Sequence, residues 1–199
     1  MKDLTFLKIA HTISTESKCV SHQVGAIIVK DDRIVSTGYN GTPSGMINCC
    51  DHARNEGWVE PKYSPIHPHD NIIKLNQDYR QNHVEWSRKN EIHAEINAIV
   101  FAAKFGISIQ GATMYTTISP CIECSKAIIQ SGIKRLVCSA EYDRAEKDWK
   151  GFISGSGIQV EILEIPKAQV LFNIHNSTNL DSIDMIGKLG RHKQTFKQG

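Results

Sequence analysis

The sequence, 199 residues long, has no long apolar run. No window approaches the roughly 18 consecutive apolar residues that a membrane-spanning helix requires. The opening residues, MKDLTFLKIAHTI, interrupt their apolar side chains with Asp3, Lys8 and His11, so they lack the continuous apolar segment and the cleavage site of a signal peptide. These absences argue against a membrane-spanning or secreted protein. We expect a cytoplasmic protein without a membrane partner.

The chain also lacks a strong charge of either sign. Its 23 Lys and Arg residues against 21 Asp and Glu residues leave a net charge of +2, and the basic residues are spread along the chain. This balance is too mild for a surface that binds duplex nucleic acid, although a small anionic ligand needs only about one or two cations. Apart from a basic segment at residues 190–199, we find no dense basic or aromatic stripe, so we expect no nucleic-acid partner.

The sequence has no internal repeat and no low-complexity tract, and its length suits one domain better than two. We expect a single domain over residues 1–199, with a core at about 3–165. The tail at 166–199 is weakly patterned and could be a surface helix or an oligomer contact.

The chain has six cysteines. In a cytoplasmic protein, cysteines are more often reduced thiols or metal ligands than disulfides.

Apolar and turn-forming residues predict strands that alternate with helices. The expected strands are 23–30, 33–39, 112–118, 134–140 and 159–165, the first two joined by a tight turn at Asp31 and Asp32. The expected helices are 3–16, 91–104, a segment from Pro120 to Gly132, and a short one near 147–155. This order favours a central sheet that helices cover on both faces. Residues 49–85 are polar, and we expect a long irregular insertion with a function of its own.

The stretch NEIHAEINAI, residues 90–99, places polar groups at the start of the predicted helix 91–104. Its first turn contains Glu91, His93 and Glu95. The side of this helix that we expect to be buried carries the apolar residues Ile92, Ile96, Ile99 and Val100. An imidazole and two carboxylates in this position indicate a chemical role.

A second polar motif, SPCIEC at residues 119–124, supplies two thiols. Pro120 is suited to open the following helix, because the first helical N–H has no helical partner. Cys121 and Cys124 are three residues apart, so on a first helical turn they face one way, and the helix dipole favours their thiolates. With His93 they give three ligands of the kinds that zinc prefers. Such a set leaves the fourth tetrahedral position for water, which is typical of a catalytic zinc.

Glu95 is better suited to transferring protons beside such an ion than to coordinating the ion. It is two residues from His93, which on an ideal helix turns it about 160° away. A carboxylate there can take a proton from the activated water and return it to the substrate. The alternative is that His93 and Glu95 are capping or surface groups and that the cysteines are buried thiols. H-x-E followed by P-C-x-x-C is the known signature of zinc-dependent deaminases, and it favours the catalytic interpretation.

From about residue 3 to 165 the chain resembles the cytidine and deoxycytidylate deaminase superfamily. The motifs that carry the resemblance are SKCVSHQVGAIIV, STGYNGTPSG, NCCDHA, NEIHAEINAI, MYTTISPCIECSKAIIQSGIKRLV and EYD. GYNG together with a long insertion before HAE is similar to the phage type of the deoxycytidylate (dCMP) branch, because tRNA adenosine deaminases have a much shorter segment there. The resemblance implies a three-layer α/β/α fold in which helices flank a central five-stranded mixed sheet.

The resemblance also implies a reaction, the hydrolysis of dCMP to dUMP and ammonia, which supplies dUMP for thymidylate synthesis. His93, Cys121 and Cys124 would hold the catalytic zinc, and Glu95 would move the protons. The substrate contacts that it implies are the N–H of Ala94 on the pyrimidine O2, the carbonyl of Ser119 on the exocyclic amine, Asn40 on the sugar hydroxyl, and Lys18 and Tyr142 on the 5′-phosphate. Asn40 is equally interpreted as a left-handed turn residue before Gly41, and Lys18 as a solvated surface residue.

Phage-type relatives of this kind carry a second, structural zinc. Matched by motif, its ligands here would be Cys19, Cys49, His83 and Glu91, with Cys50 as the alternative to Cys49. A closed site of this kind would fix an insertion that is too polar to make its own core. The alternative is that these are ordinary loop residues. We expect His67 and His69 to face solvent and Cys138 to lie in the core.

Regulation and assembly are likewise implied by the resemblance. Members of the branch are often homohexamers that dCTP activates and dTTP inhibits, with magnesium on the effector phosphates. The GYNG loop would bind the effector, which suggests Gly38, Tyr39 and Gly41 here. Relatives often carry arginine where this chain has Lys104, and lysine cannot make the same bidentate contacts.

Two other functions compete with this hypothesis. A nucleic-acid deaminase acting on tRNA or single-stranded DNA should show a basic or aromatic stripe beside its pocket. An inactive deaminase-like binding module should have lost its proton-transfer group, whereas this chain retains Glu95.

Overall fold

The computed structural model describes residues 2–61, 73–142 and 149–165. The chain divides into two compact units, Met1–Glu164 and Ile165–Gly199. The predicted tail 166–199 and the histidines at positions 67 and 69 lie outside the described residues, and the single-domain boundary stays a prediction. Among the described helices, none has the length and apolar character needed to cross a membrane.

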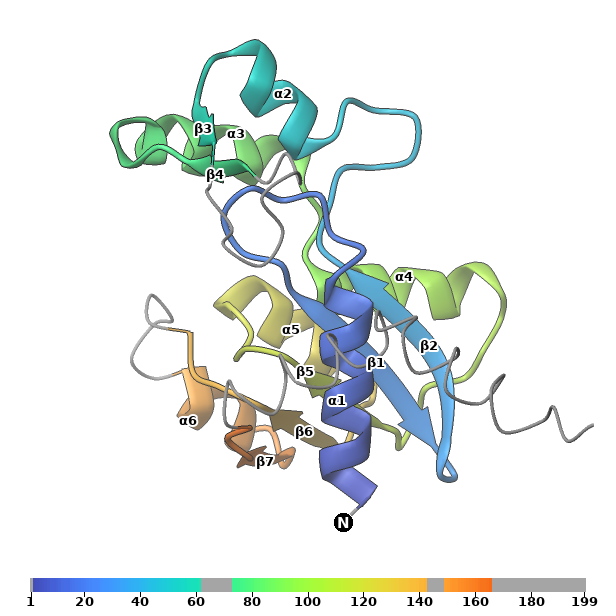
Figure 1. Cartoon of the computed structure of the whole chain (residues 1–199). Coiled ribbons are helices and arrows are strands. Elements are labelled where there is room, and N and C mark those ends of the chain that lie inside the picture. Colours follow the sequence, from blue (N-terminus) through green and yellow to red (C-terminus); the bar gives the residue numbers. More distant parts are fainter. Residues whose placement is uncertain (1, 62–72, 143–148, 166–199) are drawn as a thin grey trace, which may run out of the picture. The chain divides into compact units, whose positions relative to one another are not determined.

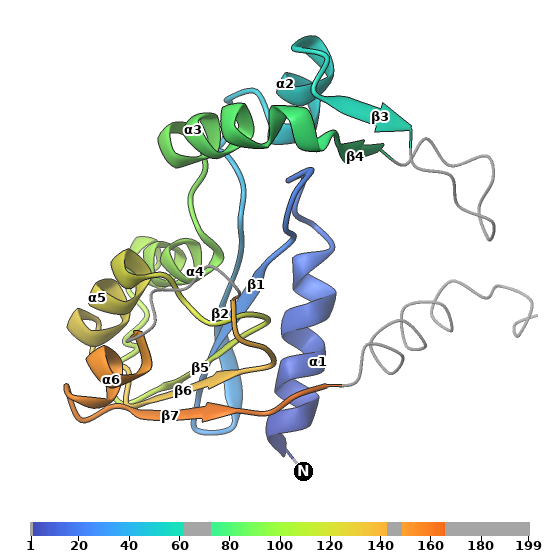
Figure 2. The same ribbon diagram turned by 90° about the vertical axis from the view of Figure 1, so that its left-hand side faces the viewer.

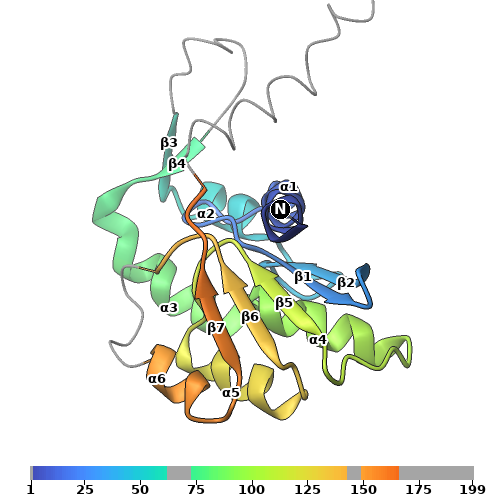
Figure 3. The same cartoon turned by 90° about the horizontal axis from the view of Figure 1, so that it is seen from below.

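A five-stranded mixed sheet forms the centre of the first unit (Figure 3). Its order is β2 (Arg33–Tyr39), β1 (Gly25–Lys30), β5 (Thr113–Thr116), β6 (Arg135–Cys138) and β7 (Gln159–Ile162). β1 pairs antiparallel with β2 and β5, whereas β5, β6 and β7 run parallel. The predicted five strands are confirmed, although all except the second, β2, are shorter than predicted.

The first two strands form the predicted hairpin. Asp31 and Asp32 link them with φ angles of 51° and 60°, the left-handed pair of a tight hairpin turn that matches the twist of the strands.

Helices cover both faces of this sheet, as predicted (Figure 2). α1 (Lys2–Ser14) packs on one face, and α4 (Ala94–Lys104), α5 (Ile122–Gln130) and α6 (Trp149–Ser154) lie on the other. The apolar core beneath the second group includes Ile28, Met114, Ile128, Leu136 and Cys138, all fully buried. The predicted core position of Cys138 is therefore confirmed.

α4 approaches β2 more closely than its apolar pattern suggests. An added Cβ at Gly38 would lie 2.3 Å from the carbonyl oxygen of Ala94 and 2.4 Å from the amide nitrogen of Ala98. The buried face of α4 is therefore made of the small residues Ala94, Ala98 and Ala102, together with Glu95. The prediction that Val100 lies on the buried side was wrong, because this residue is 54% exposed on the opposite side of the helix.

The start of α4 also differs from the prediction. The helix begins at Ala94 with His93 as its N-cap, and Glu91 follows the end of α3 (Arg80–Asn90) instead of opening α4. The backbone of Ile92 is paired with Gly41 by two hydrogen bonds: the Ile92 N–H donates to the Gly41 carbonyl (N to O 2.8 Å) and the Gly41 N–H donates to the Ile92 carbonyl (N to O 3.1 Å). Residues held in this bridge are extended and cannot continue a helix.

In its described parts, residues 49–61 and 73–85, the insertion predicted to be irregular contains helices and strands, so the prediction was wrong for these parts. It contains α2 (Cys49–Asn55), β3 (Val59–Pro61), β4 (Ile73–Leu75), the 3-10 turn η1 (Gln77–Tyr79) and α3, which lie together in space (Figure 1). Ala53, Trp58 and Leu75 form a small buried cluster, and His52 stacks on Trp86 with ring centroids 4.4 Å apart. The described part of the insertion therefore has a small apolar cluster of its own, assembled from aliphatic and aromatic residues on different elements.

Candidate metal and catalytic site

The candidate site lies at the carboxyl ends of the parallel strands β5 and β6, the end of an α/β sheet where ligands usually bind. The segment after β5 is held there by the amide of Ser119, which donates to the carbonyl of Ala140 at 2.9 Å. Pro120 is buried and precedes the N-cap Cys121, so it does not open the helix as predicted. The cap position is taken by the cysteine because its sulfur accepts the amide of Cys124 at 3.5 Å.

Three donor atoms meet at this place. The Sγ atoms of Cys121 and Cys124 each lie 3.4 Å from Nδ1 of His93. All three donor atoms lie within 4.8 Å of one another. A tetrahedral zinc with bonds of about 2.3 Å to sulfur and about 2.0 Å to nitrogen would hold such donors about 3.5 Å apart. Both the chemistry and the spacing of this donor set therefore fit a zinc ion.

The electrostatics of the three groups are strongly coupled. A hydrogen bond with Cys124 lowers the pKa of Cys121 to about 3, with a further contribution from His93. The neighbouring Cys121 sulfur raises the pKa of Cys124, and the same sulfur raises the pKa of His93 to about 9. These pKa shifts leave Cys121 as the thiolate and keep the protons on Cys124 and His93, and a bound cation would take the place of those two protons.

Glu95 lies beside this donor set. It is the second residue of α4, its side chain is 3% exposed, and its carboxyl group contacts the Cys124 side chain. Burial raises the pKa of Glu95. The predicted angle of about 160° does not apply, because His93 is extended with φ −70° and ψ 154° and only Glu95 is helical.

Two backbone groups predicted to contact the substrate are near the same place. Ala94 is the first helical residue of α4, so its N–H has no partner within the helix. Ser119 is buried immediately before Pro120, and its hydroxyl accepts the amide of Tyr142 at 2.8 Å. The structure therefore brings Ala94 and Ser119 close to the donor set from two different elements.

Asn40 is buried, and its side chain makes hydrogen bonds with the loop that follows α1. Its Oδ1 accepts the amide of Val24 at 2.8 Å, and its Nδ2 donates to the carbonyl of His22 at 2.9 Å. Its own carbonyl accepts the hydroxyl of Ser17 at 2.8 Å. The alternative interpretation of Asn40 as a left-handed turn residue was wrong, since its φ is not positive.

The remaining predicted residues are placed as follows. Lys18 is exposed, and Tyr142 is half-buried with its ring edge-on to His22 at 5.8 Å. Gly38 is buried under α4, whereas the Tyr39 side chain is 40% exposed.

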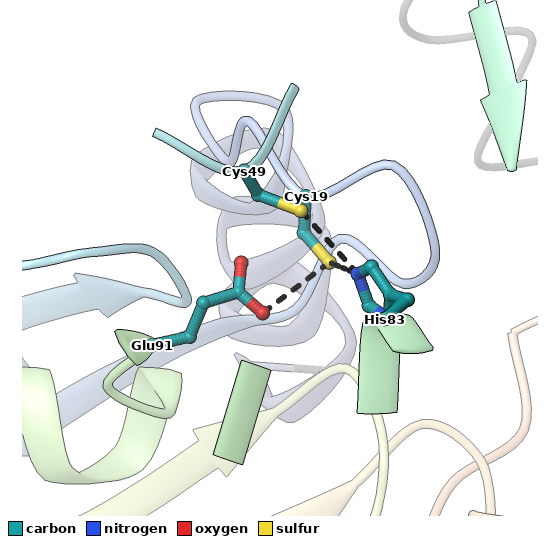
Figure 4. Close-up of side chains that lie close together, drawn as sticks. All are labelled: Cys19, Cys49, His83 and Glu91. Carbon is teal, nitrogen blue, oxygen red and sulfur yellow. Dashed lines mark hydrogen bonds between the residues drawn. The ribbon is translucent and has the colours of Figure 1, made fainter. Parts of the chain in front are cut away.

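A second group of donor atoms joins four separate segments (Figure 4). Nε2 of His83 lies 3.7 Å from the sulfur of Cys19 and 3.3 Å from that of Cys49, and Oε2 of Glu91 lies 3.6 Å from the Cys19 sulfur. These distances are again close to the separation of about 3.5 Å expected around zinc. Cys50 is turned toward the side-chain oxygen of Asn48, 2.9 Å away, and does not join the group.

The second group is buried and has one unsatisfied acceptor. Oε1 of Glu91 is buried and has no hydrogen-bond partner among the described residues, while Oε2 accepts the Ser87 hydroxyl at 2.5 Å. Burial raises the pKa of Glu91, and a hydrogen bond with Cys49 lowers the pKa of Cys19 to about 4. A buried carboxylate oxygen without a donor is what a cation would satisfy. Ser87 was not predicted to take part, because its contact with Glu91 depends on α3 ending at Asn90 and the sequence predicted a helix that begins at Glu91.

Comparison with known proteins identifies the family. A family model described as the cytidine and deoxycytidylate deaminase zinc-binding region matches residues 1–140. The chain is 47% identical over 196 residues to the deoxycytidylate deaminase of Enterobacteria phage T4, covering 92% of this chain and 97% of that protein. It is 33% identical over 144 residues to the deoxycytidylate deaminase of Mus musculus, covering 71% of this chain and 67% of that protein.

A solved structure agrees with these sequence matches. The dCMP deaminase of cyanophage S-TIM5, crystallised with dCMP and dUMP, matches with a TM-score of 0.57 and 32% identity over 80% of this chain and 95% of that chain. Fold, donor set and sequence therefore agree: the chain belongs to the zinc-binding cytidine and deoxycytidylate deaminase family.

Proposed function

We propose that the protein hydrolyses dCMP to dUMP and ammonia. The observation that supports this most strongly is the meeting of the His93, Cys121 and Cys124 donor atoms beside the buried carboxyl group of Glu95. Relatives named deoxycytidylate deaminase, and the cyanophage enzyme crystallised with dCMP and dUMP, support the choice of substrate.

His93, Cys121 and Cys124 would hold the zinc. When bound, this ion supplies Lewis acidity, which lowers the pKa of a coordinated water and makes an effective nucleophile at neutral pH. In the overall reaction a C4–O bond forms, the C4–N bond breaks, and the exocyclic nitrogen leaves as ammonia.

The chain's own residues orient the base and move the protons. Glu95 takes a proton from the attacking water, delivers one to N3 of the pyrimidine, and later protonates the departing amine. The free N–H of Ala94 donates to O2 of the base, and the Ser119 carbonyl accepts from the exocyclic amine. Asn40 has a second amide hydrogen and a second lone pair beyond its two loop contacts, and with these it binds the sugar hydroxyl.

The second donor group, Cys19, Cys49, His83 and Glu91, would hold a structural zinc. These residues come from the loop after α1, from α2, from α3 and from the segment before α4. A closed four-ligand site would therefore tie both ends of the insertion to the substrate side of the core. The unsatisfied Oε1 of Glu91 supports this assignment.

Regulation by dCTP and dTTP with magnesium, and assembly into a homohexamer in the cytoplasm, complete the proposal. Tyr39 is the accessible side chain of the proposed effector loop, and Gly41 is half-exposed. Gly38 contributes indirectly, because its lack of a side chain lets α4 pack closely on β2.

The exposed apolar side chains of Val100, Phe101 and Phe105 on and after α4 support a contact between subunits.

The function is tested by ammonia release from the purified chain. It is incubated separately with dCMP, CMP, deoxycytidine, dCTP and a tRNA, with and without added dCTP as effector. We expect dCMP to be the best substrate and dUMP the product. Release from the tRNA alone would support the nucleic-acid deaminase instead, and release from none of them would support an inactive binding module.

A further inference from the structure

A single residue of backbone separates the two donor groups. Glu91 belongs to the second group and His93 to the first, and only Ile92 lies between them. Glu91 is extended with φ −101° and ψ 142°, and His93 is extended with φ −70° and ψ 154°. Side chains two positions apart on an extended chain point to the same side, about 6.5 Å apart. A displacement of Glu91 is therefore passed directly to His93.

Hydrogen bonds make this connection rigid. The N–H and the carbonyl of Ile92 both bond to Gly41, so its backbone is fixed in the extended state. The carbonyl of His93 accepts from the amide of Asn97 at 2.9 Å, so His93 is fixed to the first turn of α4. Residues 91–93 therefore form a rigid link between the two donor groups.

The position of Glu91 depends on what occupies the second group. Its carboxyl group points toward the sulfur of Cys19, 3.6 Å from Oε2 (Figure 4). Oε2 also accepts the Ser87 hydroxyl, whereas Oε1 is buried without a hydrogen-bond partner among the described residues. A buried carboxylate that lacks partners is unfavourable, and turning it toward water relieves the cost. Without a cation, Glu91 is therefore expected to turn outward and to shift His93 with it.

The charges of the two groups act in the same direction. Two thiolates and one carboxylate in the second group outnumber by one the positive charges of a zinc ion. The occupied second group is therefore negative, and it attracts a cation that approaches His93, Cys121 and Cys124.

We propose that occupation of the second donor group positions His93, so that the two zinc ions bind cooperatively and Glu91 couples them. The inference rests on the proposed function, because it takes both donor groups to be zinc sites. The coupling is reciprocal, since each ion must raise the affinity for the other by the same factor. That factor is expected to be about fivefold to 150-fold, the usual range for two coupled sites.

The test measures zinc affinity in the absence of substrate. Metal-free protein, prepared with a chelator under reducing conditions, is titrated with zinc in competition with a chromogenic chelator. The wild type gives two association constants. Cys49→Ser gives one for the first group, and Cys121→Ser gives one for the second. We expect the product of the two wild-type constants to exceed the product of these single-site constants by about fivefold to 150-fold. Equal products would mean independent sites and would overturn the proposal.

Two substitutions at Ile92 test the link itself, because they leave every donor residue in place. Ile92→Val keeps a branched side chain and should keep the coupling. Ile92→Gly adds backbone freedom between Glu91 and His93, and it should reduce the coupling by about twofold to fivefold while two ions still bind. Cys50→Ser removes a thiol outside the second group and should match the wild type. Wild-type coupling in Ile92→Gly would contradict the rigid link.

A second variant serves if Cys49→Ser does not fold. Glu91→Gln keeps the size of the side chain and an oxygen that can accept the Ser87 hydroxyl. Zinc release to excess chelator is followed over time, and both release phases should be faster than in the wild type, although His93, Cys121 and Cys124 are unchanged. Acceleration of one phase alone would overturn the coupling.

These measurements contain no nucleotide, so they are distinct from the test of the proposed function. A wild-type chain that binds a single zinc ion would overturn both the coupling and the second metal site, while ammonia release would still decide whether dCMP is hydrolysed. Two ions bound independently would overturn the coupling alone.

Discussion

Nε2 of His11 lies 2.7 Å from the hydroxyl oxygen of Ser139, although 128 positions separate the two residues in sequence. That hydroxyl donates its one hydrogen to the carbonyl of Thr117 at 2.6 Å, so His11 must be the donor in its own bond. The contact ties α1 to the residue that follows β6, and the bond from Ser139 to Thr117 extends this link to the segment that leads from β5 to Cys121.

This contact predicts a pH dependence of stability. Burial lowers the pKa of His11 in the folded protein, whereas the unfolded chain titrates near about 6.5. Below that pH the unfolded chain takes up the proton first, so the contribution of His11 is complete above about 6.5 and is lost as the pH falls through the lowered folded pKa. In urea titrations between pH 7.5 and about 5, the wild type should lose more stability than His11→Gln. Parallel losses in the two proteins would contradict this role, since all other titrating groups are common to both.

Replacing the proposed proton carrier should separate metal binding from turnover. Glu95→Gln keeps the size of the side chain and the three donor atoms, so zinc content should remain, while kcat should fall by about a hundredfold or more. Metal analysis and ammonia release measure the two quantities. Glu85→Gln, an exposed glutamate on α3, is the control and should leave both unchanged. Full activity in Glu95→Gln would refute its role.

The adjacent cysteines of α2 provide a matched pair for the second metal. Cys49 is buried within 3.3 Å of His83, whereas Cys50 faces Asn48. Cys49→Ser should therefore lose about one zinc ion per chain and unfold at a lower urea concentration, because metal binding is coupled to folding. Cys50→Ser should retain the wild-type zinc content and stability. The same zinc content in both variants would argue against the four-residue site.

Two glycines of the loop region offer a steric comparison. A methyl group at Gly38 would meet the backbone of α4 at 2.3 Å, whereas one at Gly41 would meet nothing within 4 Å. Gly38→Ala should lower the unfolding free energy by about 1–3 kcal/mol, the usual cost of overpacking, and should reduce activity by shifting Ala94 and Glu95. Gly41→Ala should be close to wild type in thermal unfolding and in activity measured without effectors. Equal stability of the two variants would show that α4 can move away at little cost.

Much of the candidate site could be predicted from sequence because its information is local. The spacing of His93 and Glu95, and that of Cys121 and Cys124, place their side chains within one turn of backbone whatever the rest of the chain does. The hairpin at Asp31 and Asp32 was predictable for the same reason, since turn chemistry depends on adjacent residues.

The failures came from contacts between distant segments. The bridge of Gly41 to Ile92 set the start of α4, and the clustering of Trp58 with Leu75 folded an insertion whose polar composition predicted none of this. In a single sequence, neither residue of such a pair indicates which distant residue it will contact.

The sequence by itself determined the metal-binding chemistry, the order of the strands and helices outside the insertion, and the family, because residue type and short spacing carry that information. Only the tertiary structure decided which cysteine joins His83, which face of α4 is buried, and that a bridge to Gly41 holds Ile92 extended between the two donor groups. The physical reason is that burial and charge compensation depend on groups that folding brings together from far along the chain.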